Sequence, residues 1–74
     1  MSLDAVPLGK PYRIVGLRFG GCSPHRLMER GFVEGMEVQV LHRAPLGDPL
    51  QLRLGDYELS LRSSDAALID VTAI

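Results

Sequence analysis

The run from Leu50 to Arg62 allows few folds, because apolar and polar residues alternate on both sides of a tight turn. Gly55-Asp56 has glycine at its first position, as a two-residue type II′ turn between antiparallel strands requires. Counting outward from this turn gives three apolar pairs on one face: Leu54 with Tyr57, Leu52 with Leu59 and Leu50 with Leu61. The other face carries two polar pairs, Arg53 with Glu58 and Gln51 with Ser60. The run therefore predicts a β-hairpin in which both Leu52 and Leu59 are buried.

Glycine and proline divide the rest of the chain into short elements. β-Favouring residues predict a first strand over residues 10–17. Ser23-Pro24 predicts a short helix with Ser23 as its N-cap, and Gly31 predicts that it ends by Arg30. Alternation predicts a second strand over residues 37–43, which the prolines of residues 44–49 end in an exposed loop. Ser63-Ser64-Asp65 predicts one capped helical turn, followed by a last strand over residues 68–71.

Five short strands with one short α-helix inserted after the first predict an all-β, or β-rich, fold. A helix of two turns cannot cover the apolar face of an open sheet, whereas a sheet curled into a small barrel covers its own face. An SH3-like barrel fits the length of 74 residues, and a five-stranded oligonucleotide-binding barrel is the alternative. No repeat or linker interrupts residues 1–74, so we expect a single domain whose first few residues are frayed.

Composition indicates the cellular compartment of the chain and the class of partner that it binds. Cys22 is the only cysteine, so no disulfide within the chain adds to a small core, which fits a reducing compartment. The first ten residues lack the basic start and apolar stretch of a secretion signal, and no run of about 18 apolar residues occurs. We therefore expect a cytoplasmic protein without direct membrane insertion. A net charge of −1 and few, scattered aromatic residues argue against a nucleic-acid partner.

Three segments carry a family resemblance. Leu27-Met28-Glu29-Arg30-Gly31-Phe32-Val33-Glu34-Gly35 ends the helix, Arg43-Ala44-Pro45-Leu46-Gly47-Asp48-Pro49 follows the second strand, and Leu59-Ser60-Leu61-Arg62 ends the hairpin. In this order and spacing they resemble the bacterial ferrous iron transport protein A family, FeoA, from about Leu8 to Val71. The Ala-Pro-Leu-Gly-Asp-Pro loop is the most specific part. Arg30 departs from the pattern, since the family often has an apolar residue before that glycine.

The resemblance implies an SH3-like cytosolic protein that supports the large membrane transporter FeoB, which carries a cytosolic GTP-binding domain. The partner is then this ferrous iron transporter, with no small-molecule substrate. The same fold occurs as a carboxy-terminal module of iron-dependent repressors, but no helix-turn-helix precedes it here, which favours a free-standing protein. A nucleic-acid-binding or regulatory barrel and a ferrous metallochaperone are the alternatives.

Cys22 and His25 have a Cys-x-x-His spacing that places two metal ligands near the start of a helix. A structural metal site needs four protein ligands as a rule, and the other histidine, His42, lies on a separate strand. We therefore expect no metal site and no cofactor, leaving open adventitious binding by these three residues.

We also expect no enzymatic activity. A Cys-His nucleophile pair would need an orienting group and an oxyanion site, and the sequence identifies neither. No phosphate-binding Gly-x-x-x-x-Gly-Lys-Ser/Thr motif occurs, and Lys10 is the only lysine. Any GTP chemistry would therefore belong to a partner.

The candidate site is the loop after the second strand. Leu46 lies between Pro45 and Gly47 at the expected loop tip, where an apolar side chain buries little of its surface and can anchor a partner. The two prolines also shape the turn and blunt an exposed sheet edge. We expect Leu46 to be the anchor, with Arg43 and Asp48 as flanking polar contacts. The full set is Arg43, Ala44, Pro45, Leu46, Gly47, Asp48, Pro49 and the outward-facing Arg62.

Overall fold

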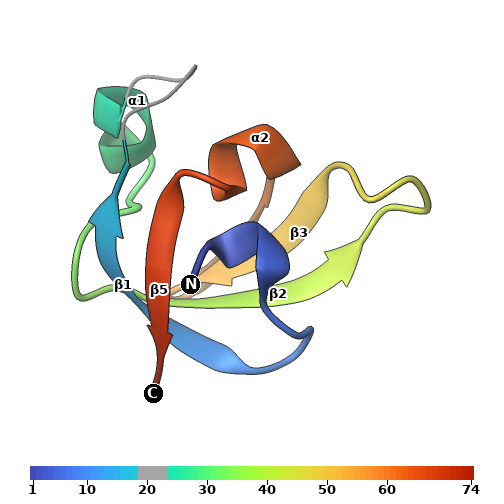
Figure 1. Cartoon of the computed structure of the whole chain (residues 1–74), viewed down its shortest axis with the longest axis horizontal. Helices are drawn as coiled ribbons and strands as arrows, with labels where there is room; N and C mark the ends of the chain where they lie inside the picture. Colours follow the sequence, from blue (N-terminus) through green and yellow to red (C-terminus); the bar gives the residue numbers. More distant parts are fainter. Residues whose placement is uncertain (19–23) are drawn as a thin grey trace.

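The computed structural model describes residues 1–18 and 24–74. The elements in chain order are η1 (Leu3–Ala5), β1 (Pro11–Leu17), α1 (Pro24–Glu29), β2 (Glu37–Arg43), β3 (Leu50–Leu54), β4 (Tyr57–Leu61), α2 (Ser63–Ala66) and β5 (Ile69–Ala73). The strands form one antiparallel sheet in the order β4-β3-β2-β1-β5, which bends strongly along its length (Figure 1). The β-rich class, with about five strands and a helix inserted after the first, is confirmed.

The hairpin has the register that its turn predicts. Leu50 pairs with Leu61, Leu52 with Leu59, and Leu54 with Tyr57. Gly55 has a positive φ of 59° and Asp56 does not, as a type II′ turn requires. The prediction that Leu59 on β4 is buried overestimated its burial, because β4 lies at the edge of the sheet. Leu52 is fully buried, but Leu59 is only partly buried and Tyr57 is half exposed.

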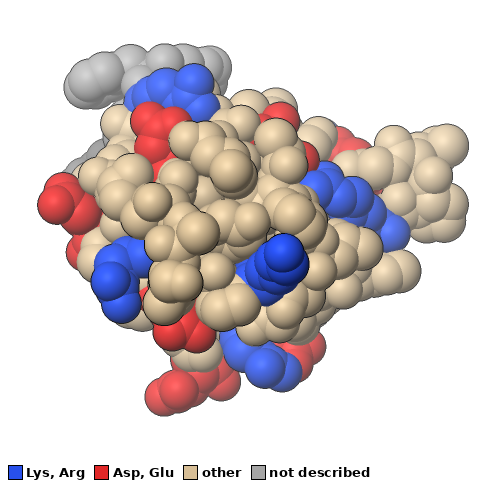
Figure 2. Space-filling model, turned by 60° about the horizontal axis from the view of Figure 1, so that its bottom comes forward, with Lys and Arg blue, Asp and Glu red and all other residues tan. Residues whose placement is uncertain are grey.

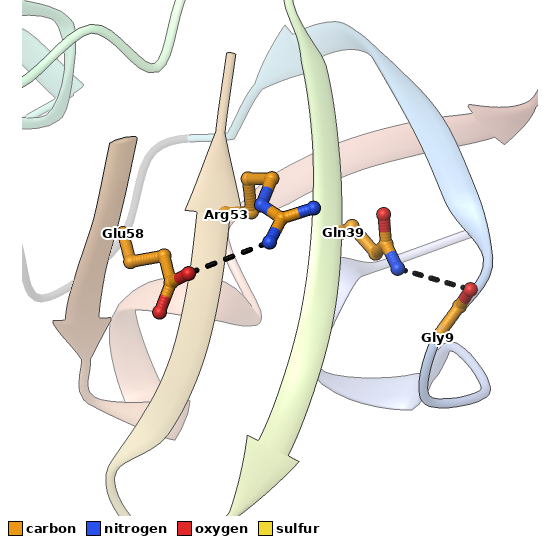
Figure 3. A network of polar contacts seen from close by, with 4 residues as sticks. All are labelled: Gly9, Gln39, Arg53 and Glu58. Carbon is orange, nitrogen blue, oxygen red and sulfur yellow. Dashed lines mark hydrogen bonds and ion pairs between the residues drawn. The ribbon is translucent and has the colours of Figure 1, made fainter. Parts of the chain in front are cut away.

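The outer face of the sheet is polar. Arg53 on β3 forms an ion pair with Glu58 on β4, with 3.4 Å between Nη2 and Oε2. On β2, Gln39 lies opposite Arg53 and donates a hydrogen bond to the carbonyl of Gly9 (Figure 3). This row of polar side chains crosses the sheet on the side away from the core, as the alternation predicts.

The core draws on almost every element, including the first residues of the chain. Its largest fully buried side chains include Phe32, Ile14 and Leu27, together with Leu3 in η1 and Val6 just after it. The backbone of Met1 accepts a hydrogen bond from Val71 N–H at 2.7 Å. The expectation of frayed first residues was therefore wrong: two apolar side chains and a strand neighbour hold them in place.

The helices are short, and their ends differ in part from the predictions. Gly31 follows α1 with a φ of 102° and its N–H bonds to the carbonyl of Met28, so the left-handed helix end is confirmed. The proposed N-cap Ser23 lies outside the described residues. Ser63 was expected to begin a capped turn, but the N-cap of α2 is Arg62, with no capping bond from its own side chain. Among the residues described, no helix has the length and apolar character to cross a membrane.

Candidate functional site

Residues 44–49, here called the partner loop, connect β2 to β3 and project from one end of the molecule (Figure 1). Arg43 and Leu50 form the last strand pair at its base. The N–H of Gly47 bonds to the carbonyl of Ala44 at 2.7 Å, which makes a β-turn with Pro45 and Leu46 in the middle. Proline at the first central position favours such a turn. Leu46 therefore stands at the tip, and it is 96% exposed.

Arg43, at the base of the partner loop, points its guanidinium toward the start of the chain. It donates hydrogen bonds of 2.9 Å each to the carbonyls of Asp4 and Val6, which lie within and just after η1. Because a guanidinium presents several donors in a fixed fork, it can hold two carbonyls at once. Arg43 thus fixes the N-terminal turn against the base of the loop.

Asp48, in the second half of the partner loop, has a partner in α2. One oxygen of its carboxylate, Oδ1, accepts a hydrogen bond of 2.9 Å from the backbone N–H of Ser63. The first N–H groups of a helix have no partner inside the helix, so Asp48 caps α2 from a distant part of the chain. Sequence reasoning missed this bond, since nothing local in the sequence joins residues 48 and 63.

The register of the hairpin brings Arg62 beside the partner loop. Leu50 pairs with Leu61, so the residues just outside this pair, Pro49 and Arg62, lie next to each other. Together with Asp48 they line an open hollow of about 250 Å³. The structure therefore gathers Asp48, Pro49 and Arg62 around one hollow, directs Leu46 away into solvent, and turns Arg43 inward.

Charges of both signs are interspersed on the face shown in Figure 2, and an uncharged lobe projects at its right edge, on the side of the partner loop. Asp48 is the one charged residue of the loop, and residues 45–47 at its tip carry no charge. Basic side chains on this face do not gather into one continuous patch of the kind that follows a nucleic-acid backbone. The loop instead offers an apolar tip, which is typical of a protein-contacting surface.

The possible metal ligands are dispersed in the described part of the chain. His42 is exposed on β2, and no group of three His, Cys, Asp or Glu residues among those described could hold a metal ion. Cys22 and the side chain of His25 lie outside the described residues, so the structure leaves the Cys-x-x-His spacing as a sequence observation.

Comparison with known proteins gives the family. A family model described as FeoA domain matches residues 1–73. The chain belongs to this family. A curated FeoA relative is the Fe(2+) transport protein A/Fe(2+) transporter FeoB fusion protein of Porphyromonas gingivalis, which is 40% identical over 74 residues. The match covers the whole of this chain but only 9% of the fusion protein.

Solved FeoA structures confirm the fold. The FeoA-like protein of Clostridium acetobutylicum is 34% identical, with a TM-score of 0.91, and the match covers 100% of this chain and 86% of that one. The FeoA of Stenotrophomonas maltophilia, solved in complex with zinc, is described as a procaryotic SH3 domain protein. It is 30% identical, with a TM-score of 0.82, and the match covers 97% of this chain and 89% of that one. The predicted SH3-like barrel is thus confirmed in preference to the oligonucleotide-binding barrel.

Proposed function

We propose that this FeoA domain is a cytosolic accessory protein of bacterial ferrous iron uptake that binds a FeoB-type transporter through the partner loop. The observation that carries the proposal is the Porphyromonas gingivalis relative, in which a FeoA segment and the FeoB transporter are one polypeptide. Fusion holds two modules at a high effective concentration, which favours a weak contact between them. Where the two modules are not fused, the same contact needs a recognition surface.

The partner loop has the physical properties of such a surface. Its tip is an exposed leucine, and two prolines, the turn bond from Gly47 and the cap on Ser63 restrict its backbone. A loop that is already ordered loses little conformational entropy on binding, so more of its contact energy appears as affinity. In this proposal Leu46 and Pro45 touch the partner, while Arg43 and Asp48 set the loop's position.

Within the transporter, we propose the cytosolic GTP-binding domain as the contact. The FeoA domain contributes no catalytic step in this scheme, because GTP hydrolysis and iron transport both belong to the transporter. Its role is to bind and to change the assembly or activity of the transporter.

The test compares two leucines that are both exposed. Leu46→Ala removes the loop tip, and Leu8→Ala, at a position that is 50% exposed in the turn before β1, is the matched control. Binding to the purified transporter and ferrous iron uptake in cells lacking their own copy are measured for each. We expect Leu46→Ala to weaken binding by about 1–2 kcal/mol and to reduce uptake, with Leu8→Ala unchanged. Full binding and uptake by a folded Leu46→Ala would remove the loop as the contact.

A further inference from the structure

We infer that the hollow lined by Asp48, Pro49 and Arg62 receives an acidic side chain, Asp or Glu, from the protein partner. This inference rests on the proposed function and adds to it the chemistry of the partner's segment. That segment carries a carboxylate for Arg62 and, beside it, an apolar surface for Leu46.

The positive charge of Arg62 is not paired with an acidic side chain in the described part of the structure. Its backbone carbonyl accepts bonds from the first turn of α2, but its exposed side chain has no hydrogen bond or ion pair with a described residue. The nearest acid in the hollow, Asp48, directs one carboxylate oxygen to Ser63 N–H instead. Although both residues line the hollow, Arg62 and Asp48 form no ion pair with each other.

Most of the other arginines form an ion pair or a hydrogen bond within the chain. Arg18 pairs with Asp70, and Arg53 pairs with Glu58. Arg43 holds two carbonyls, and Arg30 donates to the carbonyl of Ser60. Of the described arginines with no such contact, only Arg62 lines the hollow.

The lining of the hollow favours a carboxylate over a phosphate group. A guanidinium can hold a carboxylate through two parallel hydrogen bonds. A phosphate group carries close to two negative charges and would lie near the Asp48 carboxylate with a single cation to offset both. The ring of Pro49 supplies an apolar wall against the stem of a Glu or Asp side chain.

The experiment measures binding of the purified FeoB-type transporter of the same organism, in detergent, to immobilised FeoA variants. Arg62→Glu reverses the charge, Arg62→Gln removes it, and Arg62→Lys keeps it without the planar fork. Arg26→Glu is the matched control, because Arg26 is exposed on α1, at the other side of the molecule from the partner loop (Figure 1). Thermal melting of each variant confirms that it is folded.

We expect Arg62→Glu to weaken binding more than about tenfold, Arg62→Gln and Arg62→Lys to give smaller losses, and Arg26→Glu to bind as the wild type does. A Lys substitution at one acidic residue of the transporter should restore binding to Arg62→Glu specifically.

Two results would overturn the inference while leaving the proposed function in place. One is binding of Arg62→Glu and Arg62→Gln at wild-type strength while Leu46→Ala is defective. The other is an equal loss for Arg62→Glu and Arg26→Glu, which would indicate a general charge effect. A wild-type protein that does not bind the transporter at all would overturn the proposed function and this inference with it.

Discussion

The Asp48 carboxylate accepts a hydrogen bond from the backbone N–H of Ser63, the first residue of α2, at 2.9 Å. This bond joins the partner loop to the helix that follows the hairpin. Asp48 also lines the hollow beside Arg62, and Leu46 at the loop tip comes two residues before it in the sequence. The bond is exposed, so the orientation of the loop depends on a contact at the same surface that is proposed to meet the partner.

Asp48→Ala should lower the free energy of unfolding by about 0.5–2 kcal/mol, the usual cost of losing an N-cap acceptor. Asp48→Asn keeps an oxygen acceptor of the same reach and should recover most of that loss. Urea denaturation of the two variants and the wild type measures the difference. Identical midpoints for all three would mean that the bond contributes nothing to stability.

Arg43→Ala should loosen the start of the chain, because the carbonyls of Asp4 and Val6 lose their donor. A hydrogen bond to a charged group is worth about 1.5–3 kcal/mol when well buried, and Arg43 is only partly buried, so a smaller effect is expected. Amide hydrogen exchange at Ala5, whose N–H bonds to Ser2, reports the loosening directly. Exchange there should rise in Arg43→Ala more than in Arg43→Lys, and unchanged exchange in both would contradict the bracing role.

Leu52→Ala should cost about 2–5 kcal/mol, since it removes a fully buried side chain and leaves a cavity in the barrel. That is a large share of the stability of a small domain. Leu8→Ala, at an exposed position, should change stability by less than about 0.5 kcal/mol. Chemical denaturation of both variants tests the core, and a Leu52→Ala protein as stable as the Leu8→Ala control would refute it.

The isolated protein should show no stoichiometric ferrous iron site of submicromolar affinity under reducing conditions. The physical reason is that the chain has few thiol or imidazole ligands, and His42 lies on β2, away in the sequence from Cys22 and His25. Anaerobic titration measures the affinity, and a Cys22→Ala, His25→Ala double variant is the control. Tight binding that this double variant loses would favour the metallochaperone alternative.

The hairpin could be predicted in detail because its pairing depends on a two-residue turn and on alternation, both of which are local. Burial of Leu59 and Tyr57 could not, because exposure at an edge strand depends on what covers the edge. Tyr57 lies where the chain after α1 passes, and its hydroxyl donates to the carbonyl of Arg30. That contact joins residues 27 positions apart in sequence.

The loop and its leucine tip were also predictable, since proline and glycine have strong local preferences. The internal bonds of Arg43 and Asp48 were not, because they reach across 37 to 39 and 15 residues respectively. Both residues were expected to flank the Leu46 anchor as polar contacts with a partner. The buried Leu3 was missed for a related reason: one apolar residue in a short segment has no periodicity from which burial can be inferred.

The pairing of the first residues with β5 makes the fold suitable for circular permutation. Met1 accepts a hydrogen bond from Val71, and Ser2 bridges Asp70, so a short glycine-rich linker from residue 74 to residue 1 has little distance to span. New termini placed between Leu46 and Gly47 would leave the strand pairs intact but release the turn at the loop tip. Such a permutant should still melt cooperatively but fail to bind the transporter. Folding of the barrel would then be shown not to require the turn at the loop tip, on which binding depends.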